Sequence, residues 1–122
     1  MKKKSSFIGS FKFALNGILM LFKQHRNFKI QFAIGILTII CAFIFKISVY
    51  QWIAVLLCIG LVLSLEAINT VLEIVMDKIQ PEYCNTIKTA KDIAAGAVLI
   101  AAIISAVIGL IIFVPYIIKI FI

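Results

Sequence analysis

Four polar side chains stand inside an apolar stretch of the chain, the segment SLEAINTVLEIVMDK (residues 64–78). They are Glu66, Asn69, Glu73 and Asp77. On an α-helix, their spacings of three, four and four residues place them within an arc of about 80° on one face. Polar groups in apolar surroundings are costly and need a reason to be there. We therefore interpret this face as a functional site.

The two glutamates of this face lie too far apart to act on the same atom. Glu66 and Glu73 are separated by seven residues, which is about 10.5 Å along a helix axis. This distance excludes a shared proton or one water held by both carboxylates. It suits two ends of one reaction, with Glu66 at a membrane-embedded substrate and Glu73 at a metal ion nearer the cytosol. The alternative is a neutral, hydrogen-bonded Glu66 and an interfacial Asp77.

The composition indicates a membrane protein with a single domain, residues 1–122. The chain has 122 residues, of which 64% are hydrophobic, whereas soluble domains have about 45 to 50% apolar residues. Its three cysteines show no CxxC pairing and it has one histidine, so neither a disulfide framework nor a zinc site is expected. Metal chemistry would then rest on carboxylates, which favours hard ions such as magnesium.

Hydrophobic periodicity predicts an all-α membrane protein with one surface helix and three transmembrane helices. The predicted spans are residues 30–50, 52–76 and 93–118, each near the length of about 20 residues that a bilayer requires. Ahead of them, residues 5–28 carry an apolar stripe at helical spacing and predict an amphipathic helix on the membrane surface. A secretory signal peptide is the alternative, but charged and polar residues interrupt its apolar stretch.

The positive charge is concentrated before the first span. The net charge is +7, and most basic residues precede residue 30. No aromatic residues interleave with them in a stacking pattern, so we expect no nucleic acid binding. The positive-inside rule predicts a cytoplasmic N-terminus, a cytoplasmic connection over residues 77–92 and a C-terminus outside. The basic N-terminus is also expected to contact anionic membrane lipids.

The start of the third predicted span could bind phosphate. In the segment TAKDIAAGAV (residues 89–98), Lys91 and Asp92 stand where the span begins. The N-terminal end of a helix offers free backbone amides and a favourable dipole to anions. A solvated pair of charges at the membrane boundary is the alternative.

Small residues recur every four positions along the third predicted span, at Ala97, Ala101, Ser105 and Gly109. Such a ridge lets another helix approach closely. It could serve packing within one chain, but three helices make a thin bundle for a buried site. We therefore favour a homo-oligomer.

Three segments resemble the small prokaryotic diacylglycerol kinase and undecaprenol kinase family. They are EAINTVLEIVMD (residues 66–77), AKDIAAGAV (90–98) and SFKFALNGI (10–18). The resemblance implies a homotrimeric kinase of the bacterial cell membrane that transfers the γ-phosphate of MgATP to a lipid alcohol. In the first segment, Val71 stands where the family usually has a small residue.

The resemblance also implies roles for individual residues. Glu66 would be the general base that takes the proton from the lipid hydroxyl, and Glu73 would ligate Mg²⁺. Five further residues would bind the nucleotide or support the site: Asn69 and Asp77 in support, Lys91 at phosphate, Asp92 at the nucleotide and Tyr83 near the adenine.

Two further positions depart from the family pattern. His25 stands where the family usually has a second carboxylate for magnesium, and imidazole is a poor ligand for such a hard ion. This departure predicts weaker magnesium binding; His25 can also be interpreted as a solvated residue of a basic stretch. Cys84 stands where the family often has histidine, and we expect only a modest effect on the nucleotide contact.

The acceptor lipid is the least constrained prediction. The stretch RNFK (residues 26–29) resembles the Gram-positive branch of the family, in which the acceptor is undecaprenol. Diacylglycerol is the alternative acceptor, because both lipids present a hydroxyl above apolar tails. Two other interpretations remain open: a small transporter lined by carboxylates, and an inactive kinase-like membrane protein.

Overall fold

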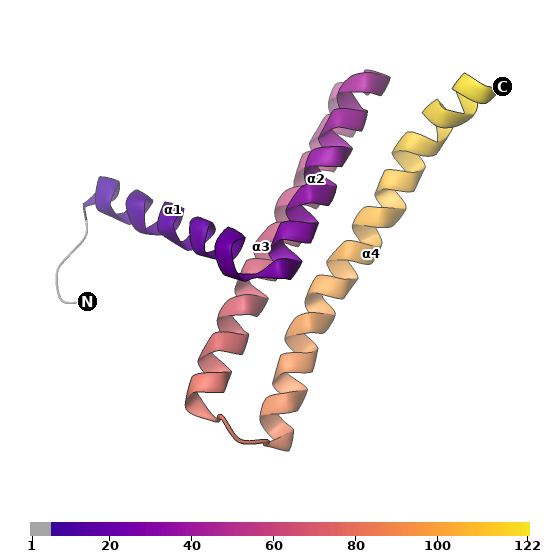
Figure 1. Cartoon of the computed structure of the whole chain (residues 1–122). Helices are drawn as coiled ribbons and strands as arrows, with labels where there is room; N and C mark the ends of the chain where they lie inside the picture. The colour runs from indigo at the N-terminus through magenta and orange to yellow at the C-terminus, as the bar shows by residue number, and fades with distance from the viewer. Residues whose placement is uncertain (1–5) are drawn as a thin grey trace.

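The computed structural model describes residues 6–122 and is entirely helical over this range. The helices are α1 (Phe7–Gln24), α2 (Arg26–Phe45), α3 (Val49–Ile79) and α4 (Asn85–Phe121). Helices α2, α3 and α4 form a bundle, and α1 points away from it (Figure 1). All three bundle helices are long and apolar enough to cross a membrane. The predicted fold class, one N-terminal helix followed by three apolar helices, is confirmed.

Helix α1 has no buried residue. The Ser6 hydroxyl begins it by accepting a hydrogen bond from the Gly9 amide at 3.0 Å. Its apolar stripe stays open, with Phe7 87% and Phe11 61% exposed. An amphipathic helix whose apolar side is mostly exposed suits the surface of a membrane.

Helix α1 ends at Gln24, earlier than the sequence predicted. His25 has extended backbone angles, φ −123° and ψ 108°, and α2 begins at Arg26. Residues 26–28, assigned from the sequence to the surface helix, therefore belong to α2. The ring of Phe22 packs edge-to-face on those of Phe28 and Phe32, with centroids 5.1 and 4.7 Å apart. These contacts hold α1 against α2 across the break.

The turn between α2 and α3 also shifts the predicted bounds of the first two spans. Lys46 adopts a left-handed conformation with φ 53° and ends α2. Ser48 and Gln51 then form a reciprocal capping box, in which each side chain accepts a hydrogen bond from the other's amide. Because this motif satisfies free amides of the first turn, α3 begins at Val49, inside the span predicted to reach residue 50.

The most densely packed part of the bundle lies at this turn. Its buried residues are Ala42, Ile47, Val55 and Ile112. The Tyr116 hydroxyl donates a hydrogen bond of 2.6 Å to Gln51 Oε1, and the Tyr116 ring stacks on Phe45 with centroids 5.8 Å apart. The C-terminal part of α4 is thereby fixed to the α2–α3 turn.

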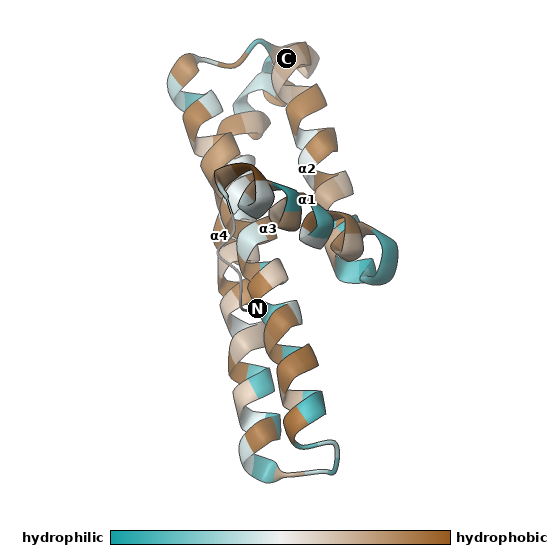
Figure 2. Cartoon of the chain, turned by 90° about the vertical axis from the view of Figure 1, so that its left-hand side faces the viewer, coloured by the Kyte–Doolittle hydropathy of each residue, from teal (hydrophilic) through white to brown (hydrophobic). Residues whose placement is uncertain are grey.

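Helices α3 and α4 are longer than a membrane crossing requires. Their 31 and 37 residues correspond to about 46 and 55 Å, against a hydrocarbon thickness of about 30 Å. Helix α4 begins at Asn85 and not near residue 93, so the connection is residues 80–84 and not 77–92. The prediction from hydropathy covered only the apolar part of this helix. Hydrophilic residues gather at the α3–α4 end and along α1 (Figure 2).

A groove of about 550 Å³ runs between α2 and α4, with α3 as its floor. It is almost wholly apolar, and residues such as Thr38, Cys58 and Ser105 line it. The small-residue ridge of α4 is divided between two environments. Ala101 is buried, whereas Gly109 lines the groove and a Cβ placed on it would meet no described atom within 4 Å.

Candidate functional site

The buried part of the polar face of α3 lies level with the joint between α1 and α2. Gly35 of α2 approaches α3 so closely that a Cβ on it would lie 3.1 Å from Ile59 Cγ2. The two helices are antiparallel, so a step of seven residues along each from this contact brings Phe28 level with Glu66. His25 precedes Phe28 by three residues, so it lies about level with Asn69 of α3.

Glu66, Asn69 and Thr70 are buried, with exposed fractions of 6%, 6% and 3%. The Thr70 hydroxyl donates to the Glu66 carbonyl oxygen at 2.9 Å. Asn69 Oδ1 has no hydrogen-bond partner among the described residues. A buried acceptor left without a donor costs about 1–3 kcal/mol, and such a group needs an explanation. A ligand that donates a hydrogen bond to Asn69 Oδ1 would explain why this oxygen is left free.

Glu73 and Asp77 continue the face towards the end of α3 and are exposed. Helix α3 runs without interruption from Val49 to Ile79, so the helical register that groups the four side chains applies along the whole segment. Glu73 lies seven residues beyond Glu66 and four before Asp77, so along α3 it stands between the buried glutamate and the Asp77–Lys91 ion pair.

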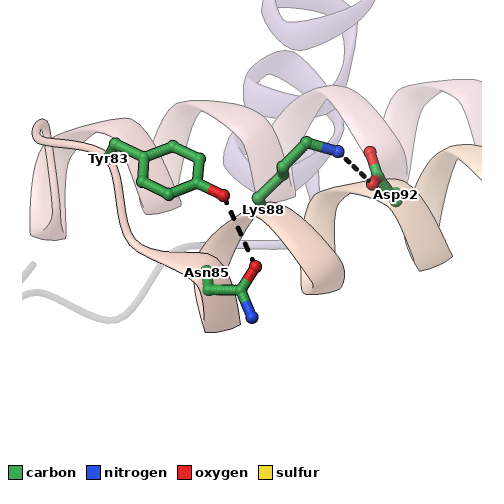
Figure 3. A network of polar contacts seen from close by, with 4 residues as sticks. All are labelled: Tyr83, Asn85, Lys88 and Asp92. Carbon is green, nitrogen blue, oxygen red and sulfur yellow. Dashed lines mark hydrogen bonds and ion pairs between the residues drawn. The ribbon is translucent and has the colours of Figure 1, made fainter.

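Two ion pairs lie at the α3–α4 end. Lys91 Nζ is 2.6 Å from Asp77 Oδ1 and joins α4 to α3. Lys88 Nζ is 2.7 Å from Asp92 Oδ2, within α4. The Tyr83 hydroxyl donates to Asn85 Oδ1 at 3.4 Å, and Figure 3 shows this contact beside the Lys88–Asp92 pair. The structure thus gathers Asp77, Tyr83, Lys91 and Asp92 near one hairpin.

The predicted position of Lys91 and Asp92 at a helix N-terminus is wrong. Helix α4 begins at Asn85, so these two are its seventh and eighth residues. Only the first four amides of a helix lack an intrahelical acceptor. A phosphate at this place would be bound by side chains, with Lys91 as the cation, and not by free backbone amides.

Lys88 is a candidate site residue that the sequence analysis missed. Its spacing of four residues from Asp92 is the usual spacing of helical ion pairs, so the pair could have been found once α4 was extended back to Asn85. The Asp77–Lys91 pair spans 14 residues and two helices. Local spacing rules give no signal for it.

Among residues 6–122, no three His, Cys, Asp or Glu side chains are grouped as a metal site. Magnesium usually needs only one or two carboxylates, because water and substrate phosphates complete its shell. Glu73, an exposed carboxylate near the Lys91 ammonium, fits this kind of site. His25 lies near the same face but supplies no oxygen ligand.

Comparison with known proteins finds relatives along most of this chain. The family described as "Prokaryotic diacylglycerol kinase" matches residues 12–113. An undecaprenol kinase of Bacillus subtilis is 40% identical over 109 residues, which cover 89% of each chain. A diacylglycerol kinase of Synechocystis sp. is 38% identical over 101 residues, which cover 82% of this chain and 58% of that protein. The matched region includes every candidate site residue.

Proposed function

The chain belongs to the prokaryotic diacylglycerol kinase family, whose members are ATP-dependent lipid kinases, and we propose that its acceptor lipid is undecaprenol. The observation that best supports a kinase function is the row of polar groups along α3. It extends from buried Glu66 to the Asp77–Lys91 ion pair at the hairpin. The Bacillus subtilis undecaprenol kinase matches along most of both chains, and the RNFK stretch agrees with that branch. Diacylglycerol is the second candidate.

The membrane surface is proposed to lie at the level of α1. The N-terminus and the α3–α4 hairpin would then face the cytoplasm of a bacterial cell, and the C-terminus would lie outside. Helix lengths support this placement, because α3 and α4 exceed the hydrocarbon thickness and their extra turns hold the charged residues. Glu66 would then stand near the interface, where a lipid alcohol presents its hydroxyl.

In this arrangement, Glu66 acts as the general base. The lipid hydroxyl oxygen attacks the γ-phosphorus, the bond to the β,γ-bridging oxygen breaks, and the hydroxyl proton passes to the Glu66 carboxylate. Phosphoryl transfer depends mainly on alignment and charge stabilisation. The burial of Glu66 limits the access of water, which would compete with the lipid as acceptor.

The nucleotide is proposed to bind at the α3–α4 hairpin. Lys91 would contact phosphate, Asp92 the nucleotide and Tyr83 the adenine, with Asn69 and Asp77 in support. The Asp77 carboxylate is 66% exposed, and exposed ion pairs contribute about 0–1 kcal/mol. A phosphate group can therefore take the Lys91 ammonium from Asp77.

Mg²⁺ is the proposed metal, and Glu73 would hold it. The ion would supply charge neutralisation to the phosphates of ATP. With imidazole at His25 in place of a second carboxylate, more of its shell would come from water and phosphate oxygens.

We also propose that the assembly is a homotrimer. The apolar groove between α2 and α4 is open in one protomer, and Gly109 leaves room along it for a neighbouring helix. Small residues that permit close approach are typical of helix interfaces in membranes. The number of protomers, three, is inferred from the resemblance to the family.

The proposed function can be tested by incubating the purified protein with γ-labelled ATP and with undecaprenol or diacylglycerol in matched detergent micelles. We expect label in both lipids, with the higher kcat/KM for undecaprenol. Higher kcat/KM for diacylglycerol would reject the proposed acceptor. If neither lipid becomes labelled, kinase activity in this chain is rejected, and an inactive relative or a transporter is favoured.

A further inference from the structure

Lys88 occupies a central position on the nucleotide side of α4 that no role assigned above explains. Relative to Asn85, Lys88 and Asp92 follow after three and seven residues, so the three project within about 60° on one face. Tyr83 and Asn85 lie at one end of this face and Asp92 at the other, with Lys88 between them (Figure 3). A nucleotide that reaches from Tyr83 to Asp92 would pass over Lys88.

Lys88 and Lys91 are also neighbours on α4. They differ by three residues, which is about 4.5 Å along the axis and about 60° around it. Lys91 turns towards α3, where it meets Asp77, and Lys88 turns towards Asp92. The two ammonium groups therefore border the same stretch of helix surface from adjacent directions.

Both lysines form ion pairs with carboxylates of the chain. The Lys88 and Asp92 side chains are 58% and 64% exposed, and an exposed pair of this kind contributes about 0–1 kcal/mol. A phosphate chain offers several charged oxygens at once and forms stronger charge-assisted hydrogen bonds. Exchange of a carboxylate for phosphate is therefore favourable at Lys88 as well as at Lys91.

We propose that Lys88 is a second phosphate-binding residue, which leaves Asp92 when ATP binds and joins Lys91 at the phosphate chain. The released Asp92 carboxylate can then accept hydrogen bonds from the nucleotide. This inference rests on the proposed nucleotide site at the hairpin. It differs from a role in which Lys88 only holds Asp92 in position.

The test compares ATP with adenosine, which lacks phosphate, on the full chain in detergent micelles. Lys88→Met should weaken equilibrium ATP binding about five- to tenfold, as expected for one lost charge-assisted contact at an exposed site, and leave adenosine binding unchanged. Lys88→Gln should behave like Lys88→Met, and Lys88→Arg should retain ATP affinity. Unchanged ATP binding in both neutral variants would overturn the proposal.

Lys78→Met is the matched control. Lys78 is an exposed lysine in the last turn of α3, and it forms no ion pair among residues 6–122. We expect its ATP affinity to equal that of the wild type. An equal loss in Lys78→Met would show a general charge effect and would contradict a specific contact by Lys88.

Adenosine distinguishes phosphate binding from the positioning of Asp92. Equal weakening of adenosine and ATP by Lys88→Met would assign Lys88 to positioning and reject phosphate contact. The transfer assay separates this result from the wider proposal. If the wild type phosphorylates lipid while Lys88→Met binds ATP normally, only the role of Lys88 is wrong; if the wild type phosphorylates no lipid, the kinase function fails first.

Discussion

The two ends of the helical bundle use polar side chains in opposite ways. At the α2–α3 turn, Gln51 Oε1 accepts hydrogen bonds from the Ser48 amide and the Tyr116 hydroxyl, and aromatic rings pack around them. All of these groups are neutral and their partners lie within the chain. At the α3–α4 end, the polar groups are mostly ionised and exposed, and their ion pairs are open to exchange.

This difference indicates that one end of the bundle stabilises the fold and that the other carries the functional residues. Neutral hydrogen bonds among packed aromatic rings fix the three helices to one another. The half of α3 that leads to the hairpin retains a buried Asn69 oxygen without a hydrogen-bond partner among residues 6–122, and it carries exposed carboxylates. We infer that the first end determines stability and the second determines catalysis.

The largest expected effect comes from Glu66→Gln. A general base contributes about 10²- to 10⁴-fold to a rate, so we expect kcat for transfer to lipid to fall about a hundredfold or more. The amide has the same shape and no charge, and the thermal denaturation temperature should not fall. Transfer rates and denaturation curves in the same detergent check both statements.

At the opposite end, Tyr116→Phe should reduce stability and leave the transfer rate unchanged. The variant keeps the ring that stacks on Phe45 but loses the hydrogen bond to Gln51, a loss of about 0.5–1.5 kcal/mol. Thermal denaturation measures this change. Tyr83→Phe is the matched control for stability, because its hydroxyl forms a longer bond of 3.4 Å at an exposed site. Equal destabilisation by both would contradict the division between the two ends.

The smallest effect is expected from His25→Glu. This change restores a carboxylate near the acidic face of α3, so the magnesium concentration for half-maximal rate should fall by about two- to fivefold, as expected for one added oxygen ligand at an exposed site. A magnesium titration of the transfer rate measures it. An unchanged titration would show that His25 is remote from the metal.

Hydropathy and periodicity were sufficient to predict the four helices but not where each begins and ends. The ends depend on local groups: the extended backbone at His25, the left-handed Lys46 and the Ser48–Gln51 capping box. Helix α4 extends eight residues before the predicted start because a helix satisfies its own backbone hydrogen bonds in water as well as in lipid. An apolar window detects only the membrane part.

The candidate site was predictable where it depends on one helix and not where it depends on two. Four polar residues of α3 share a face because of their spacing alone. The Asp77–Lys91 ion pair, by contrast, requires the packing of α3 on α4. The burial of Asn69 likewise requires the other helices to pack against α3. These features follow from tertiary structure, which no local pattern encodes.

The most direct test of the central claim is one measurement of γ-phosphate transfer to undecaprenol by Glu66→Gln and Tyr116→Phe, at matched protein concentration and below both denaturation temperatures. The account predicts that Glu66→Gln loses about a hundredfold or more of the wild-type rate and that Tyr116→Phe retains it. A wild-type rate in Glu66→Gln would contradict the assignment of catalysis to the acidic face of α3.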